Sequence, residues 1–328
     1  MDSLIPEGVL AVVAGVFGLI LGSFGTVLSY RVPLGESIMG RSHCPSCGHM
    51  VTWVENFPVF SWVLLRGKCR HCGNRISPRY PVTELLTGVL FALAALKFGF
   101  TLETLAYGLF FWLLVVLTVI DFEHHKLPDA LVFPLIAGGV LLLVAAAAVD
   151  GRFGRWSPLA WVASAVVLLE IFLVFDFKRL FSKREETPEP DPRVRWEGLI
   201  FVAVWAGLLV WSAIEGTTTS LSGAAVGAAL FSGLFFGIVY IKPAGMGAGD
   251  IKLAIALGVF CGFLGAPKIV IVAAFLAFLI GGVLSGVLMM LGKAGRKTAL
   301  PFGPFLALGT TVAIFVGNDI ADAYLGTF

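Results

Sequence analysis

Charged residues are scarce in this sequence. Only 13% of its 328 residues are Asp, Glu, Lys or Arg, whereas a water-soluble domain averages about 25%. Hydrophobic residues make up 58% of the chain, and the mean hydropathy is +0.93. A chain of this composition cannot hide its apolar surface in a water-soluble core. The composition therefore excludes an ordinary soluble globular protein and predicts one whose solvent is lipid.

Basic residues are absent before the first apolar run, which covers residues 8–29 and is preceded by Asp2 and Glu7. A secretory signal peptide has the opposite arrangement, with Lys or Arg ahead of its apolar segment. We therefore expect no cleaved signal. The first run is predicted to remain in the protein as a membrane span.

The apolar runs predict about ten transmembrane helices, because a helix needs roughly 20 apolar residues to cross a bilayer. The predicted spans lie near 8–29, 81–97, 103–120, 130–149, 158–177, 198–215, 221–241, 250–264, 267–291 and 302–318. The predicted fold class is an all-α polytopic membrane protein. We find no reliable internal repeat in the sequence.

Lys and Arg are concentrated in three hydrophilic stretches, residues 31–80, 178–197 and 292–300, and the opposite loops are short and poor in them. Because basic loops stay in the cytoplasm, these three stretches are predicted to be cytoplasmic. Both termini then lie outside the cytoplasm. Asp121 and Asp250, each next to an apolar run, both fall at the cytoplasmic face.

These features divide the chain into five predicted segments. They are a first span (1–30), a cytoplasmic cysteine loop (31–80), a membrane core (81–157), an inserted helical pair (158–220) and a second membrane core (221–328). The inserted pair encloses the stretch 178–197, whose run EETPEPDP is acidic and rich in proline. Such a composition is typical of a flexible linker.

Four of the five cysteines form two CxxC pairs in the cysteine loop, Cys44 with Cys47 and Cys69 with Cys72. Two such pairs can close a tetrahedral four-thiolate site, which is typical of structural zinc. Disulfides are disfavoured because the cytoplasm keeps thiols reduced. A redox role, another metal and an empty site are the alternatives. We predict a small zinc-ribbon-like loop domain.

Two carboxylates adjoin apolar runs, Asp121 in TVID and Asp250 in GMGAGD. An acid at the rim of a span is costly to desolvate and therefore indicates function. If the two lie close together, one keeps a proton while the other activates water, as peptide hydrolysis requires. In the alternative interpretation, each is a solvated residue at a helix end, paired with Lys126 or Lys252.

Other polar positions have two interpretations each. Gly247 and Gly249 allow a bend or a close approach beside Asp250; no strand precedes them, so a nucleotide-binding loop is disfavoured. Asp129 is expected to cap the next helix, with a catalytic role as the alternative. Glu84 either extends to the membrane surface or lines a polar pocket.

The motifs in this order resemble those of the type IV prepilin leader peptidases, a family of GxGD-type membrane aspartyl proteases. The resemblance covers most of residues 1–150 and 221–315. It rests on GSF (22–24) with SYRVP (29–33), CPSC with CRHC, SPRYPVTELLTG (77–88), IDFEHHKLPDALVFP (120–134), GMGAGDIKLAIALG (245–258) and LPFGPFLALG (300–309). Two features depart from the family pattern. Gly25-Thr26 replaces the usual Leu-Asn, and the helical pair at 158–215 is additional.

The resemblance implies that Asp121 and Asp250 are catalytic and that the four cysteines hold zinc. It further implies a substrate, the basic leader of a type IV prepilin or pseudopilin, cut at the cytoplasmic face of a bacterial inner membrane for type IV pili or type II secretion. Many members then methylate the new N-terminus with S-adenosylmethionine. Lipid is an expected partner, and nucleic acid is not.

Three further residues are expected to support the site: Lys252, Pro301 and Gly303. Pro301 offers irregular backbone that could hold an extended substrate. The main rival interpretation is a transporter or channel with a structural zinc loop, which predicts acids near the bilayer midplane and a repeat between halves. A third is a membrane zinc protein that only recruits a partner.

Overall fold

The computed structural model is helical over most of the chain. It describes residues 6–151, 158, 160–167, 204–208, 210–211, 214, 220–241, 247–293 and 301–325. Regular secondary structure in these ranges is α-helix, and isolated β-bridges there include those of His43 with Met50 and of Lys68 with Arg75. The chain separates into two compact units, Met1–Leu131 and Val132–Phe328, which are described in turn.

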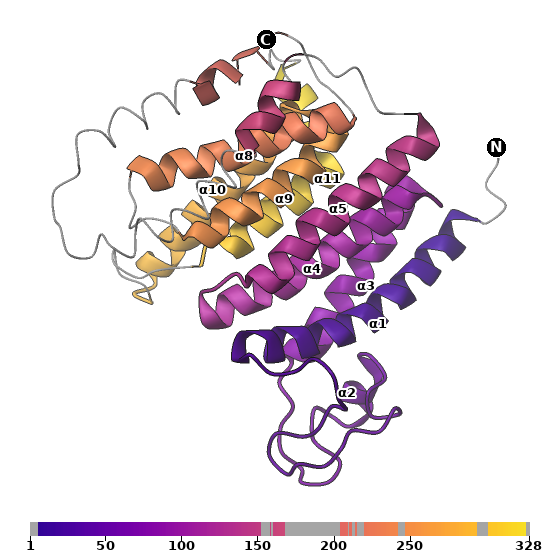
Figure 1. Cartoon of the computed structure of the whole chain (residues 1–328). Coiled ribbons are helices and arrows are strands. Elements are labelled where there is room, and N and C mark those ends of the chain that lie inside the picture. The colour runs from indigo at the N-terminus through magenta and orange to yellow at the C-terminus, as the bar shows by residue number, and fades with distance from the viewer. Residues whose placement is uncertain are drawn as a thin grey trace. The chain divides into compact units, whose positions relative to one another are not determined.

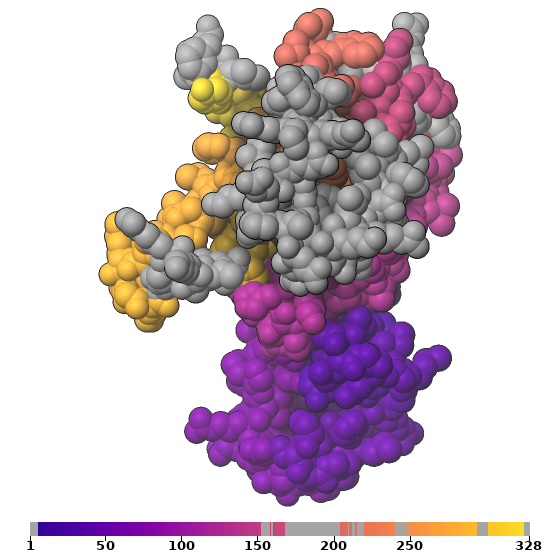
Figure 2. Space-filling model, turned by 60° about the vertical axis from the view of Figure 1, so that its left-hand side comes forward, coloured from indigo at the N-terminus to yellow at the C-terminus, as the bar shows by residue number. Residues whose placement is uncertain are grey.

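Unit 1 is a bundle of three long helices that carries the cysteine loop. Its helices are α1 (Glu7–Leu34), α2 (Phe60–Leu64), α3 (Arg79–Phe98) and α4 (Leu102–His124). The three long helices pack against one another, and α2 lies in the loop that joins α1 to α3 (Figure 1). Both general views place this loop at one end of unit 1 (Figure 1 and Figure 2).

Glycines let α1 and α3 approach each other closely. A Cβ added to Gly22 would lie 2.7 Å from the Cα of Glu84, and one added to Gly18 would lie 2.9 Å from the Cα of Gly88. Small residues at such contacts are typical of membrane helices, because packing rather than the hydrophobic effect must hold helices together in lipid. A larger residue at Gly22 would push α1 away from Glu84.

Trp112 explains how this chain accommodates glycine at position 25. A Cβ added to Gly25 would lie 2.8 Å from Nε1 of Trp112 and 2.9 Å from Cγ2 of Val116, both on α4. The Trp112 ring also stacks on Phe24, with ring centroids 6.0 Å apart. The indole therefore fills the space that a leucine at position 25 would need.

Unit 2 is a helical bundle arranged around α9. Its helices are α8 (Leu221–Ile241), α9 (Ala248–Gly265), α10 (Lys268–Met290), α11 (Gly303–Leu325) and most of α5 (Asp129–Asp150). α9 contacts α8, α10 and α11, and residues 251–263 of α9 are all buried. The helix that carries Asp250 is therefore enclosed by protein along most of its length.

The backbones of α8 and α9 touch at glycines. A Cβ on Gly258 would lie 2.4 Å from the Gly227 carbonyl oxygen, and a Cβ on Gly262 would lie 2.3 Å from the Gly223 carbonyl oxygen. These distances are below any real Cβ contact. The sequence spacing of four residues on each helix brings both pairs onto one face. Any side chain at Gly258 would therefore separate the two helices.

Seven of the described helices are long and apolar enough to cross a membrane: α1, α3, α4, α5, α8, α10 and α11. The predicted all-α polytopic class is confirmed. Eight predicted spans correspond to helices, α9 being the eighth. The predicted spans 158–177 and 198–215 lie largely outside the described residues, although 160–167 and 204–208 are helical. The predicted count of about ten therefore stays a prediction.

Candidate active site and metal centre

The four cysteines of the cysteine loop lie together. Their sulfur atoms are all within 4.8 Å of one another, and those of Cys44 and Cys72 are 3.9 Å apart. In a tetrahedral site with Zn–S bonds of about 2.3 Å, the sulfur atoms are about 3.8 Å apart. The spacing of Cys44, Cys47, Cys69 and Cys72 therefore fits a four-thiolate zinc site, as the sequence predicts.

Two turns of the same design present these cysteines. In the first, the Cys44 N–H donates to the His49 carbonyl and the Gly48 N–H donates to the Cys44 carbonyl, both at 2.9 Å. The second turn, around Cys69 and Gly73, repeats both hydrogen bonds. Gly48 and Gly73 have φ of 69° and 70°. Glycine adopts this left-handed conformation without steric strain, and each turn thus has the residue it needs.

The two turns also contact each other with approximate two-fold symmetry. His49 and Asn74 occupy equivalent positions in the two turns, as do Ser46 and His71. Each residue of the first pair contacts a residue of the second pair in the opposite turn. His49 stacks on His71, with ring centroids 3.4 Å apart, and Asn74 Nδ2 donates to Ser46 Oγ at 2.5 Å. These contacts hold the turns face to face. The histidines support the cluster, and its ligand atoms are all sulfur.

The chemistry of the cluster suits a metal. Backbone hydrogen bonds from Ser46 and Cys47 lower the pKa of the Cys44 thiol to about 6. Desolvation and the neighbouring Cys44 raise the pKa of the Cys47 thiol to about 11, so these two sulfurs share their protons unequally. The lowered pKa of Cys44 favours the thiolate, which is the form that binds zinc. The ligand number, the sulfur spacing and the thiolate all fit a structural ion with no open coordination position.

Arg31, in the last turn of α1, holds the start of the loop. Its guanidinium donates to the backbone carbonyls of Ser37, Met39 and Arg41 at 3.1, 3.3 and 3.2 Å. Arg31 is buried, so these bonds are partly shielded from water. They direct the chain toward Cys44. Sequence reasoning missed this role because the three partners are backbone groups.

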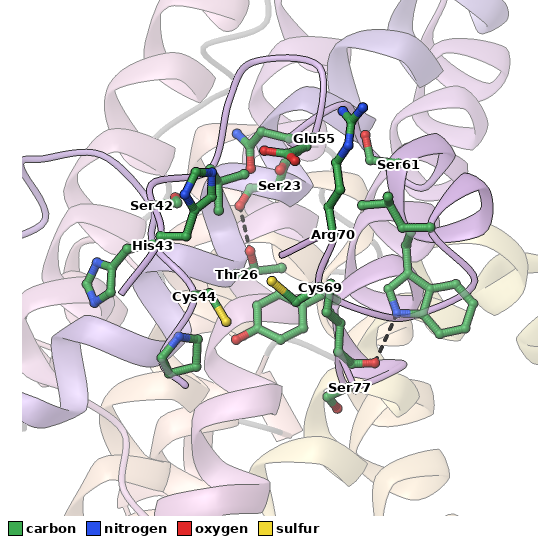
Figure 3. A pocket seen from close by; sticks show the side chains of 18 of the residues that line it. Ser23, Thr26, Ser42, His43, Cys44, Glu55, Ser61, Cys69, Arg70 and Ser77 are labelled. Atoms are coloured by element: carbon green, nitrogen blue, oxygen red, sulfur yellow. Dashed lines mark hydrogen bonds between the residues drawn. The ribbon is translucent and has the colours of Figure 1, made fainter. Parts of the chain in front are cut away.

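A cavity of about 400 Å³ lies between the cysteine loop and the adjoining parts of α1 and α3 (Figure 3). Its lining combines carboxyl, hydroxyl and aromatic groups: Ser23 and Tyr30 from α1, Glu55 and Trp62 from the loop, and Tyr80 and Glu84 from α3. Cys44 and Cys69 also line it. The volume is within the range of small-molecule sites. The sequence predicted a polar pocket only as one of two alternatives for Glu84, and it did not predict the other lining residues.

Glu84 is the buried acid of the cavity. Its Oε2 accepts a hydrogen bond from the Val59 N–H at 2.6 Å, and the side chain of Ser23 is a second hydrogen-bond partner. Only 7% of Glu84 is exposed. Of its two predicted roles, the structure shows a pocket-lining residue and not one that extends to the membrane surface.

Asp121 is buried in the last turn of α4, with 6% exposed. The predicted span ends at residue 120, but α4 continues to His124, so Asp121 lies within the helix and not after it. An ion pair between Arg79, the first residue of α3, and Glu123 holds this turn. A helix-terminal acid that is buried and flanked by such an anchor is suited to a precise position.

Asp250 lies in the first turn of α9. Its Oδ2 accepts the Gly247 N–H at 3.1 Å, and the Asp250 N–H donates to the Gly247 carbonyl at 3.1 Å. Gly247 is exposed, and Gly249 and Asp250 are half-buried. A carboxylate in the first turn is favoured by the helix dipole. The motif glycines therefore form the turn that presents Asp250.

The remaining predicted residues occupy separate places. Lys252 is buried, with Nζ 5.4 Å from the centroid of the Phe133 ring. Asp129 is the first helical residue of α5, within the helix and not before it as the predicted cap. Pro301 lies just before α11, and Gly303 is the first residue of that helix. Asp121 belongs to unit 1 and Asp250 to unit 2, and their pairing stays a prediction.

Two family models match the chain. Residues 16–98 match the Bacterial Peptidase A24 N-terminal domain, and residues 197–286 match the Type IV leader peptidase family. The first match contains the cysteines and Glu84, and the second contains Asp250. No solved structure gives a significant match to the chain.

Curated relatives with the name prepilin leader peptidase/N-methyltransferase also match. That of Bacillus subtilis (strain 168) is 31% identical over 312 residues, which cover 94% of this chain and 96% of that protein. That of Stutzerimonas stutzeri is 29% identical over 335 residues, or 94% and 92% of the two chains. That of Myxococcus xanthus (strain DK1622) is 47% identical over 133 residues, 40% of each chain.

Proposed function

The chain belongs to the type IV leader peptidase family, and on that premise we propose that it removes the leader of type IV prepilins with Asp121 and Asp250 as the catalytic pair. The observation that carries the assignment is that each acid lies in a terminal turn of a long helix within a family motif. Asp121 is buried in the last turn of α4, and Asp250 is held in the first turn of α9 by Gly247. The substrates would be prepilins or pseudopilins of a pilus or a type II secretion system.

In the proposed reaction the two carboxyl groups share one proton, because two carboxylates side by side cannot both ionise cheaply. The ionised group takes a proton from water, which attacks the carbonyl carbon of the scissile bond. The protonated group then donates its proton to the leaving amine. The irregular backbone around Gly247 and Pro301 would hold the substrate extended, since a helical peptide bond is shielded by its own hydrogen bonds.

The test is cleavage of a co-expressed prepilin, followed by N-terminal sequencing of the product. Asp121→Asn and Asp250→Asn should each abolish leader removal while membrane insertion and bound zinc persist. Asp319→Asn, which changes an exposed acid of α11, is the matched control and should cleave normally. If either active-site variant still processes the prepilin, the assignment of that aspartate is wrong.

We assign a structural zinc ion to the four cysteines. The relatives' name also includes an N-methyltransferase activity, and we assign S-adenosylmethionine as the methyl donor for it. This donor supplies an electrophilic methyl group. The cavity in unit 1 suits it: Glu84 offers a buried negative charge for a cationic group, and Tyr30 and Trp62 offer rings for the adenine. Glu84 and these rings would orient the donor and keep water away from it.

We place the protein in a bacterial inner membrane as a multi-pass protein. The excess of Lys and Arg in residues 31–80 supports a cytoplasmic cysteine loop and a cytoplasmic catalytic face, with both termini on the other side. The basic leader of a prepilin would then stay in the cytoplasm while its apolar helix enters the bilayer. The five-segment division of the chain is retained as part of this proposal.

A further inference from the structure

The cysteine loop carries an apolar patch that the proposed chemistry does not use. Its six large side chains are 53% to 84% exposed: Trp53, Val54, Phe57, Phe60, Val63 and Leu64. The last three follow the i, i+3, i+4 spacing within α2, so they share one face of it. The other face is used inside the loop, where Trp62 Nε1 donates to the Ile76 carbonyl at 3.1 Å.

Two contacts hold parts of the patch together. The rings of Phe57 and Phe60 are in edge-to-face contact, with centroids 6.0 Å apart. The Ser61 hydroxyl of α2 donates to the Val54 carbonyl at 2.6 Å, which holds the segment that contains Trp53 and Val54 against the helix. Large exposed apolar surfaces of this kind mark sites of contact with another molecule or a membrane.

The position of the patch relative to α3 indicates that it contacts the membrane and not another macromolecule. The N–H of Val59, the residue before α2, donates a hydrogen bond to Glu84, which lies five residues after the start of α3. Twenty residues of helix span about 30 Å, which is the thickness of the hydrocarbon core. Val59 therefore lies beside the first turns of a membrane span, at the level where headgroups meet acyl chains. Phe57 and Phe60 are its neighbours at that level.

The charge of the loop points to anionic lipid. Residues 31–80 contain seven Lys or Arg and two Asp or Glu. Arg66 and Lys68 follow α2 directly, and both are exposed. Such a surface attracts anionic headgroups and repels the basic leader of a prepilin. Exposed Trp, Phe and Leu beside basic residues are typical of segments that lie in the membrane interface.

We propose that this patch inserts into the headgroup region of the membrane leaflet next to the cysteine loop, and that Arg66 and Lys68 contact anionic phospholipids there. The inserted face of α2 anchors the zinc loop against the bilayer. The cavity beside Glu84 is thereby held at a constant height above the membrane. This inference depends on the membrane location of α3 and is independent of the aspartate chemistry.

The test uses the full chain in nanodiscs of phosphatidylcholine with phosphatidylglycerol. The photoreactive residue p-benzoylphenylalanine replaces Phe60 or Leu64 in turn, and the adducts are identified by mass spectrometry. Val82, exposed on α3, is the lipid-facing control position, and Arg70, in the second cysteine turn, is the control away from the patch. Zinc content and leader removal show that each variant is folded.

We expect lipid adducts at Phe60 and Leu64 that approach those at Val82 and exceed those at Arg70 by about tenfold. In phosphatidylcholine alone the yield at Leu64 should fall by about fivefold, because the basic residues lose their partner. Adducts to another segment of this chain, to a second copy or to an added prepilin would overturn the proposal. So would a yield at Phe60 and Leu64 no higher than at Arg70.

Discussion

Among single residues, Glu84 has the role that the structure clarifies most. A carboxyl in the first part of a membrane span can extend to the surface or be retained for function. Here the Glu84 carboxyl is buried, accepts a hydrogen bond from the Val59 N–H and lines the cavity. Burial of an acid is expensive unless its charge is used. The placement therefore suits recognition of a cationic ligand, such as the proposed methyl donor.

Glu84→Gln should separate the two activities. Glutamine keeps an acceptor oxygen for the Val59 N–H, so the loop stays in place, but the negative charge is lost. A hydrogen bond to a charged group contributes about 1.5–3 kcal/mol, which predicts a roughly ten- to hundredfold loss of methyl transfer. Leader removal should stay within about twofold of wild type. The measurement is label transfer from S-adenosylmethionine to a cleaved prepilin.

Glu36→Gln, at an exposed position of the same loop, is the control and should leave both activities unchanged. An equal loss of both activities in Glu84→Gln would mean that Glu84 only supports the fold. Unchanged methyl transfer would show that the methyl donor does not bind in this cavity.

Among the structural elements, the cysteine loop is expected to depend on the zinc ion proposed for its four cysteines. The loop contains one helix of five residues among its described elements, and many of its apolar side chains face outward. The two turns, their mutual contacts and the Arg31 hydrogen bonds converge on the four sulfurs. Such a segment is too small to fold on a hydrophobic core alone, and a closed metal site supplies the missing free energy.

Removal of the metal should therefore unfold the loop and leave the helices in place. Cys47→Ser, or treatment with a strong chelator, should abolish stoichiometric zinc and increase amide exchange in residues 36–78. Far-ultraviolet circular dichroism should change little, because the long helices carry the signal. Cys261→Ser is the matched control, since that cysteine is buried in α9. Full protection of the loop without metal would contradict the structural role.

The contact between α8 and α9 fixes the position of α9 and therefore of Asp250. Gly258→Ala forces a clash between the two backbones, because the new Cβ would lie only 2.4 Å from the Gly227 carbonyl oxygen. Overpacking of this kind destabilises by about 1–3 kcal/mol. We expect a lower Tm of the purified protein and a loss of leader removal as α9 moves. Circular dichroism in detergent and the cleavage assay measure the two effects.

Gly282→Ala on α10 is the matched control, because an added Cβ there meets nothing within 4 Å. It should leave cleavage unchanged and raise stability slightly, by about 0.5–1 kcal/mol, since alanine favours a helix over glycine. If Gly258→Ala behaves in the same way, α8 and α9 are not held by the glycine contact.

For the whole molecule, the proposed active site needs one residue from each compact unit. Asp121 lies in the last turn of α4 in unit 1, and Asp250 lies in the first turn of α9 in unit 2. The rival interpretation as a transporter predicts acids at the bilayer midplane and an internal repeat. Both acids are at helix ends, and the family match favours the peptidase.

Mixing experiments test whether both acids act within one chain. Asp121→Asn and Asp250→Asn proteins, co-reconstituted in one bilayer, should give no leader removal if each site takes both residues from the same chain. The double variant Asp121→Asn/Asp250→Asn alone, at the same total amount, sets the background. Recovery of about a quarter of the wild-type rate would show that the pair forms between chains instead.

Much of the fold and part of the site were predictable from the sequence. The composition predicts the membrane class, the apolar runs predict eight observed helices, and the CxxC spacing predicts the cysteine cluster. The predicted helix that leads to Asp121 ended four residues too early, because polar residues such as Glu123 were assigned to the loop. An ion pair with Arg79 stabilises Glu123 in the helix.

Composition, periodicity and short motifs act over a few residues, so the chain alone determines its solvent, its helices and its metal ligands. Other contacts join segments that are far apart in sequence. They are the hydrogen bonds of Arg31, the hydrogen bond from the Val59 N–H to Glu84 and the packing of Trp112 against Gly25. Such contacts depend on where whole helices pack, and helix packing is decided by the shape of many side chains together. Only the tertiary structure could therefore reveal the cavity and the exposed face of α2.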